Sequence, residues 1–201
     1  MALFGLTRTL NPEPLLRGDG LYLRPATPAD YSAWSQLRAA SRAFLEPWEP
    51  TWPDDDLTLA AFRRRLRRQE EDIARDEAYA FLIFDSTSDE LWGGITLGGL
   101  RRGVSQTGTL GYWMGQRHSG RGRMTRAVAA AVDFAFARLR LHRVEAACIP
   151  DNLPSIAVLE CNGFQSEGYA RGYLKIDGAW RDHVLYARLE TDVIAKSASK
   201  A

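Results

Sequence analysis

The sequence has few of the features that mark secreted, membrane-bound or metal-binding proteins. Only two of its 201 residues are cysteines, Cys148 and Cys161. Two thiols cannot build a disulfide framework, and their spacing matches no common metal motif. No apolar run approaches the ~18 residues that a membrane-spanning helix needs, and no signal peptide is recognisable at the start. We therefore expect a cytoplasmic protein that holds no metal and binds no membrane.

An excess of one charge is also missing. Lys and Arg total 26 and Asp and Glu total 25, which gives a formal net charge of +1. Without a strong field over the whole surface, nothing predicts DNA binding. The densest basic cluster, residues 63–68, shares a predicted helix with an apolar stripe and has acidic residues one turn away. This pattern favours a solvated, ion-paired helix face, with RNA contact as the alternative.

The length of the chain suits one domain. Pro12, Pro14 and Gly18 predict that residues 1–18 form an arm, and the final AKSASKA predicts a tail over residues 191–201. Between them, from 19 to 190, the hydrophobic periodicity changes in the order β, α, α, three strands, α, β, α, β, β. This order predicts an α+β fold, with a mixed sheet of about seven strands and about four helices packed on it.

The most informative segment is a glycine-rich turn between a predicted strand, 108–114, and a predicted amphipathic helix, 121–139. Glycines let the backbone approach a ligand closely. The first turn of a helix carries unpaired N–H groups and a partial positive charge, which favour a phosphate or diphosphate. A plain connecting loop is the alternative, but arginines at a helix N-terminus oppose the dipole unless an anion lies between them. The predicted anion ligands are Arg117, Gly120, Arg121, Gly122, Arg123, Met124 and Thr125.

Several motifs resemble one enzyme superfamily, the GCN5-related N-acetyltransferases (GNAT). The acetyl-CoA loop of that superfamily is similar to Arg117-x-x-Gly120-x-Gly122, and its second cofactor element is similar to Asn152 together with Asn162-Gly163-Phe164. Residues 44–50 and 173–185 resemble the RimJ-type ribosomal-protein alanine N-acetyltransferases, and the likeness extends over residues 21–189. The resemblance implies the GNAT fold, acetyl-CoA as cosubstrate, and acetyl transfer to the N-terminal amine of a protein, with ribosomal proteins as the leading candidates.

The resemblance also implies residue roles. Many superfamily members have a tyrosine that protonates the CoA thiolate where this chain has Leu159, which has no proton to give. In the RimJ type a serine takes that role, and Ser155 stands at its position in this chain. Ser155 also fits a helix-capping partner of Asn152. Glu167, predicted in a turn before the next strand, is the candidate base for an α-amine with a pKa of roughly 7.7–8.0. A solvated loop glutamate is the alternative, and His183 is the second candidate base.

Backbone groups and aromatic side chains complete the predicted site. The N–H groups of Trp113 and Met114, at an expected bulge of their strand, are the candidates for stabilising the oxyanion. We expect the pantetheine arm to run as an extra strand beside the backbone from Tyr112 to Met114. Asn152 is expected to contact the cofactor as well. The predicted acceptor-binding residues are Phe44, Trp48 and Tyr173.

Several functions therefore compete. The leading one is acetyl transfer to a protein N-terminus by direct attack in a ternary complex, without an acyl-enzyme. The second is the same chemistry on a small amine, such as an antibiotic or a polyamine. The others are a non-catalytic CoA-binding protein and an RNA-binding module. The sequence leaves the oligomeric state open between a monomer and a homodimer.

Overall fold

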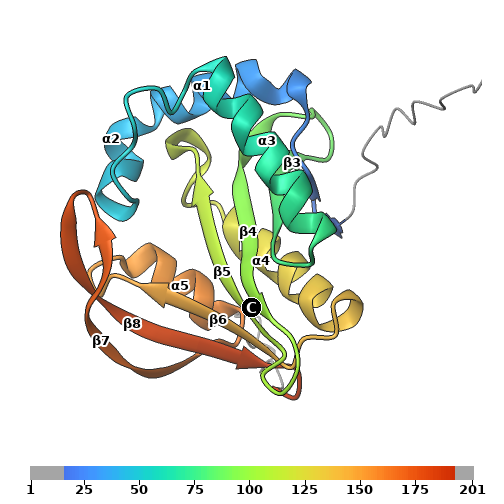
Figure 1. The fold of residues 1–201 in the computed structure, drawn as a ribbon, viewed down its shortest axis with the longest axis vertical. Helices are drawn as coiled ribbons and strands as arrows, with labels where there is room; N and C mark the ends of the chain where they lie inside the picture. The colour runs from blue at the N-terminus through green and yellow to red at the C-terminus, as the bar shows by residue number, and fades with distance from the viewer. Residues whose placement is uncertain (1–15, 193–201) are drawn as a thin grey trace, which may run out of the picture.

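The computed structural model describes residues 16–192, which form one mixed sheet with helices on both faces (Figure 1). The strands are β1 (Leu16–Gly18), β2 (Leu21–Arg24), β3 (Tyr79–Asp85), β4 (Leu91–Arg101), β5 (Thr107–Met114), β6 (Arg143–Cys148), β7 (Gln165–Ile176) and β8 (Ala179–Leu189). The helices are α1 (Tyr31–Ala40), α2 (Arg42–Leu45), α3 (Leu59–Ala74), α4 (Arg123–Asp133) and α5 (Leu153–Cys161). The predicted α+β class is confirmed, with one strand more than expected in the described range. No helix within that range is both long and apolar enough to cross a membrane.

One pair of strands differs from all the others, and it creates the site. The strand order is β1-β2-β3-β4-β5-β6-β8-β7, and β5 and β6 are parallel whereas the other neighbours are antiparallel. β5 and β6 pair only from Thr107 with Arg143 to Thr109 with Glu145, and then they diverge (Figure 1). Beyond this point β5 stays paired with β4 but has no described strand on its other side. An extended ligand can pair with such a free edge.

Side chains along β5 alternate between the two faces of the sheet. Leu110 and Met114 belong to the main core, which α4 covers. Trp113 packs against a second core on the opposite face, which α1 and α3 cover. The free half of β5 therefore lies between two layers of helices.

The predicted boundary of the arm is wrong: β1 pairs with β2, so residues 16–18 belong to the sheet. The helix that carries the basic cluster begins at Leu59, and Thr58 caps it: its Oγ1 accepts the N–H of Ala61 at 3.2 Å. The rest of the predicted arm and most of the predicted tail lie outside the described residues.

The aspartates before α3 pair with the arginine cluster. Asp55 contacts Arg64 at 2.5 Å, and Asp56 contacts Arg65 at 2.9 Å. Part of the cluster is therefore ion-paired, as expected for a solvated helix face, although the acidic partners precede the helix.

Candidate active site

The free edge of β5 presents backbone N–H groups to solvent. The N–H of Gly115, just after the strand, donates to the carbonyl oxygen of Trp92 in β4 at 2.8 Å. Because N–H groups alternate in direction along an antiparallel strand, that of Trp113 also turns toward β4. The N–H groups of Tyr112 and Met114 turn the other way, toward the free edge. Of the two predicted oxyanion donors, Met114 therefore has a free N–H group and Trp113 does not. The second free N–H group belongs to Tyr112.

The bulge expected beside Met114 lies elsewhere. The register between β4 and β5 is continuous from Gly93 to Gly98 and shifts only between Gly98 and Arg101, at the far end of the pair. The N–H groups near Met114 are available because β5 diverges from β6, and not because β5 bulges away from β4.

The glycine-rich turn leads into α4 with its first N–H groups unblocked. Gly120 and Gly122 adopt left-handed φ angles of 73° and 67°, which only glycine takes at little cost. Gly122 is the N-cap of α4, so the helix starts two residues later than predicted, and no side chain caps it. The N–H groups of Arg123, Met124 and Thr125 are thus left to bind an anion.

A buried histidine organises the same turn. The side chain of His118 is 3% exposed and lies between two arginines. Nε of Arg117 donates to its Nε2 at 2.8 Å, and Nη1 of Arg123 lies 3.1 Å from its Nδ1. Burial lowers the pKa of His118, and the arginines lower it further against the opposing charge of Glu90. The neutral ring has a single lone pair, so it accepts a hydrogen bond from only one of the two guanidinium groups and packs against the other.

A cavity of about 570 Å³, the edge cavity, follows the free edge of β5 from the glycine-rich turn to α5. The predicted site residues that line it are Phe44, Trp48, Tyr112, Trp113, Met114, Gly120, Gly122, Arg123, Met124, Thr125, Asn152 and Ser155. Arg117 and Arg121 do not line it. Arg117 pairs with Glu90 at 2.9 Å, and Arg121 is exposed.

α5 and β5 together place a pair of hydroxyls in the edge cavity, one from Ser155 and one from Tyr112. Asn152 caps the helix, with its Oδ1 accepting the N–H of Ser155 at 3.2 Å, so the capping hypothesis is confirmed. The cap uses only the backbone of Ser155. Its Oγ lies 2.8 Å from the hydroxyl of Tyr112 and 3.1 Å from Sγ of Cys148. Burial raises the pKa of Tyr112, so its phenol stays protonated at neutral pH.

The Asn-Gly-Phe sequence after α5 joins this helix to α4. Nδ2 of the buried Asn162 donates to the carbonyl oxygens of Thr125 at 3.1 Å and Val158 at 2.8 Å. Gly163 follows with a φ of 76°, the left-handed helix end that an Asn-Gly pair favours. The motif therefore fixes the hydroxyl pair relative to the anion-binding turn.

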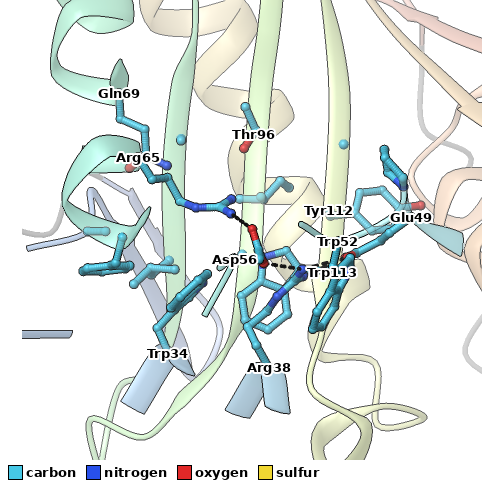
Figure 2. A pocket seen from close by; sticks show the side chains of 18 of the residues that line it. Trp34, Arg38, Glu49, Trp52, Asp56, Arg65, Gln69, Thr96, Tyr112 and Trp113 are labelled. Carbon is cyan, nitrogen blue, oxygen red and sulfur yellow. Dashed lines mark hydrogen bonds and ion pairs between the residues drawn. The ribbon is translucent and has the colours of Figure 1, made fainter. Parts of the chain in front are cut away.

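A second cavity, the face cavity, lies on the side of the sheet that α1 and α3 cover (Figure 2). Its volume is about 420 Å³. The edge and face cavities share Glu49 and the β5 residues Gly111, Tyr112 and Trp113. A Cβ added at Gly111 would meet no atom within 4 Å, so this glycine leaves open space where the cavities approach each other.

The comparisons with known proteins fit this geometry. Residues 20–165 match the family model described as the acetyltransferase (GNAT) domain. The chain belongs to the GNAT family. Probable N-acetyltransferase YjcK of Bacillus subtilis is 40% identical over 178 residues, which cover 89% of this chain and 98% of that protein. The ribosomal protein uS5-alanine N-acetyltransferase of Escherichia coli is 34% identical over 181 residues, which cover 90% and 93%.

The solved structures agree with the GNAT assignment. Mycobacterium smegmatis RimJ in complex with CoA-disulfide superposes with a TM-score of 0.81 and 34% identity, covering 87% of this chain and 85% of that one. The protein is therefore an N-acetyltransferase that uses acetyl-CoA. Its residues suit this cosubstrate, because the edge cavity offers N–H groups for the diphosphate at one end and hydroxyls at the other. Among residues 16–192, no three His, Cys, Asp or Glu side chains are grouped to hold a metal ion.

The structure does not bring Glu167 to the edge cavity of this GNAT enzyme. Glu167 lies within β7, not in a turn, and its exposed carboxylate accepts hydrogen bonds from both terminal nitrogens of Arg143. The hydrogen bonds from Arg143 lower the pKa of Glu167, which weakens it as a base. His183, the second candidate, lines the edge cavity and is 3% exposed.

The predicted acceptor-binding residues are separated. Phe44 and Trp48 line the edge cavity, whereas Tyr173 lines neither cavity. The ring of Tyr173 packs edge-on against His183, with 5.6 Å between the ring centroids. The β7–β8 hairpin also reaches the loop that follows α2, where the N–H of Asp177 donates to the carbonyl oxygen of Glu49 at 2.9 Å.

Sequence reasoning missed the charged wall of the face cavity. Arg38 comes from α1, and Glu49 and Asp56 come from the loop before α3. Only Glu49 falls in a segment that the sequence singled out, residues 44–50, which resemble the RimJ type, and that resemblance gave Glu49 no role. No motif contains Arg38 or Asp56.

Proposed function

We propose that this N-acetyltransferase acetylates the N-terminal α-amine of a protein, with ribosomal proteins as the leading acceptors. The observation that carries the proposal is that two cavities share Gly111, Tyr112 and Trp113 as lining residues. A thioester in the edge cavity and an amine that enters from the face cavity would meet there, and direct attack needs that arrangement. The likeness to the uS5-alanine N-acetyltransferase of Escherichia coli, over 93% of that protein, supports this acceptor class.

The proposed binding of acetyl-CoA uses backbone more than side chains. The first N–H groups of α4 and the guanidinium of Arg123 hold the diphosphate. The pantetheine arm pairs with the backbone at Met114, next to the anion-binding turn, and directs the thioester along the free edge to the residues that line both cavities. The N–H of Tyr112, which lines both cavities, then faces the acetyl carbonyl oxygen and stabilises the negative charge that develops there.

The proposed base is His183. Its Nδ1 lies 3.0 Å from the carbonyl oxygen of Arg181, and a carbonyl only accepts hydrogen bonds. In the neutral ring Nδ1 therefore carries the proton, and Nε2 keeps the lone pair that takes a proton from the ammonium group of the acceptor. Glu167 is the alternative base, and to act it must leave Arg143 and reach the amine through water.

The proposed acid side consists of two hydroxyls. When the C–S bond breaks, the thiolate of CoA accepts a hydrogen bond from Ser155, while Tyr112 donates in turn to Ser155. The two hydroxyls would take the role of the tyrosine that many superfamily members have at the position of Leu159. Leu159 itself is fully buried. Because Tyr112 donates to Ser155, it can replace a proton that Ser155 passes to the sulfur.

The test compares acceptors with the purified protein and acetyl-CoA. We expect thiol release with a peptide that begins with alanine, and mass spectrometry should place one acetyl group on its α-amine. The same peptide with a blocked N-terminus, which keeps any lysine, is the matched control. Turnover of spermidine or an aminoglycoside at a higher kcat/KM than the peptide would favour the small-amine function instead.

A further inference from the structure

The centre of the face cavity is an immobilised arginine. The guanidinium of Arg38 stacks between the rings of Trp52 and Trp113, at 4.0 Å and 5.0 Å from their centroids (Figure 2). Both of its terminal nitrogens donate to the carboxylate of Glu49 at 2.8 Å. The Arg38 side chain is only 8% exposed. Such a rigid, buried group is suited to recognition, because little conformational entropy remains to be lost on binding.

Two atoms of this wall have no hydrogen-bond partner among the described residues: Nε of Arg38 and Oδ2 of Asp56. The other oxygen of Asp56 accepts from Arg65 at 2.9 Å. Oδ2 lies 3.9 Å from Nη2 of Arg38, which is an ion-pair distance and too long for a hydrogen bond. Buried polar groups are normally paired, so this donor and this acceptor, on two residues that line the same cavity, indicate a ligand that supplies both complements.

The charges of the wall select the kind of ligand. Arg38 and Arg65 balance Glu49 and Asp56, so the group is neutral as it stands. A cationic polyamine or a free carboxylate would leave a net charge among three tryptophans, Trp34, Trp52 and Trp113, at a high desolvation cost. A neutral group with one N–H and one C=O adds no charge and meets both unpaired atoms.

An extended peptide residue has this pattern. In a strand, the N–H and the C=O of one residue point the same way, so both can bond to a single partner beside the chain. In the proposed reaction the α-amine lies where the two cavities meet. The chain that follows it then enters the face cavity, so the second residue of the acceptor is the one that reaches Arg38 and Asp56.

We propose that the face cavity reads the backbone of the acceptor's second residue, with its N–H donating to Oδ2 of Asp56 and its C=O accepting from Nε of Arg38. Asp56 and Arg38 are thereby specificity-determining residues. They favour peptides over amines that lack this backbone pair. The inference rests on the proposed function, because it assumes a peptide acceptor.

The experiment removes the hydrogen bond between the acceptor N–H and Asp56, once by changing the acceptor and once by changing the enzyme. The acceptors are an alanine-initiated peptide and its depsipeptide, in which an ester oxygen replaces the N–H of the second residue. For the wild-type enzyme we expect kcat/KM to fall about 10-fold to 100-fold on this change, as for a lost hydrogen bond to a charged group. For Asp56→Ala, the peptide should fall to the depsipeptide level and the ratio should approach one.

Asp55→Ala is the matched control, because Asp55 is the neighbouring aspartate, also pairs with an arginine, and does not line the cavity. It should keep the wild-type ratio. An unchanged ratio in Asp56→Ala, with a normal melting temperature, overturns the inference. If that variant does not fold, equal kcat/KM for peptide and depsipeptide in the wild type overturns it. Failure of the wild type to acetylate any peptide contradicts the proposed function instead, so the two failures are distinguishable.

Discussion

The two cavities are built from different kinds of sequence. The anion-binding end of the edge cavity comes from consecutive residues, 118–125, whose backbone does most of the proposed binding. The charged wall of the face cavity comes from Arg38, Glu49, Asp56 and Arg65, which lie on α1, on a loop and on α3. A backbone site can be recognised from a short motif, whereas a side-chain site exists only after distant elements have packed.

The largest expected effect concerns the base, and it tests whether the structure or the family pattern identifies that residue. His183→Gln should lower kcat by about 10²–10⁴-fold, the usual contribution of a general base. Glu167→Gln removes only an exposed ion pair, which contributes about 0–1 kcal/mol to folding, and should change kcat little. Steady-state rates with an alanine-initiated peptide, together with melting temperatures, measure both. The reverse order of effects would restore Glu167 as the base.

The next effect tests the backbone site. In Gly122→Val the valine must adopt the φ of 67°, which costs about 1–2 kcal/mol of stability and disturbs the first N–H groups of α4. We expect CoA to bind about 100-fold more weakly, or about 2.7 kcal/mol. Gly103→Val is the matched control, since Gly103 has the same φ, equally open surroundings, and no place in either cavity. Calorimetry should find normal CoA affinity in the control. Equal losses in both would show that the turn binds no diphosphate.

A smaller effect distinguishes the role of the Ser155 hydroxyl in the reaction from the role of Asn152 as the cap of α5. Ser155→Ala keeps the helix cap, because the cap uses the backbone N–H, and should lower kcat about 10-fold through the lost hydrogen bond to the thiolate. Asn152→Ala should lower the free energy of unfolding by about 1 kcal/mol. Denaturation curves and single-turnover rates distinguish them. A Ser155→Ala enzyme with full activity would exclude the hydroxyl from the reaction.

The smallest expected effect is a pH dependence of stability. Burial lowers the pKa of His118 in the folded state, so the unfolded chain binds the proton more readily. The free energy of unfolding should therefore decrease as the pH falls below about 6.5, the pKa of an ordinary histidine. His118→Gln should flatten the melting temperature between pH 5 and pH 8. His142→Gln, which changes an exposed histidine, should leave the wild-type slope. A slope that survives His118→Gln would assign it to other groups.

Several expectations from the sequence depended on local patterns, and these agree with the structure. The Gly-rich turn enters α4 through a left-handed Gly122, and Asn152 caps α5. Both features follow from the conformational preferences of one residue and its near neighbours. The position of Glu167 was wrong because it depended on long-range pairing. β7 begins at Gln165 and Arg143 lies nearby, and neither fact is visible in the residues around Glu167.

Gly115 illustrates the same limit. A Cβ at this position would lie 2.4 Å from Cδ1 of Leu37, so the glycine lets α1 approach the turn after β5. In the sequence it is one more glycine in a glycine-rich segment. Its requirement comes from a residue almost eighty positions away, and no periodicity or spacing reports such a contact.

The order of residues alone predicted an α+β fold and a turn suited to a diphosphate, because hydrophobic period, left-handed glycines and free helix N–H groups act over a few residues; acetyl-CoA as the ligand followed only from the family resemblance. It could not reveal that β5 would part from β6, that Tyr112 would meet Ser155, or that a balanced set of charges would surround Arg38. Those features arise where segments far apart in the chain pack together, because their side chains meet only in the folded protein.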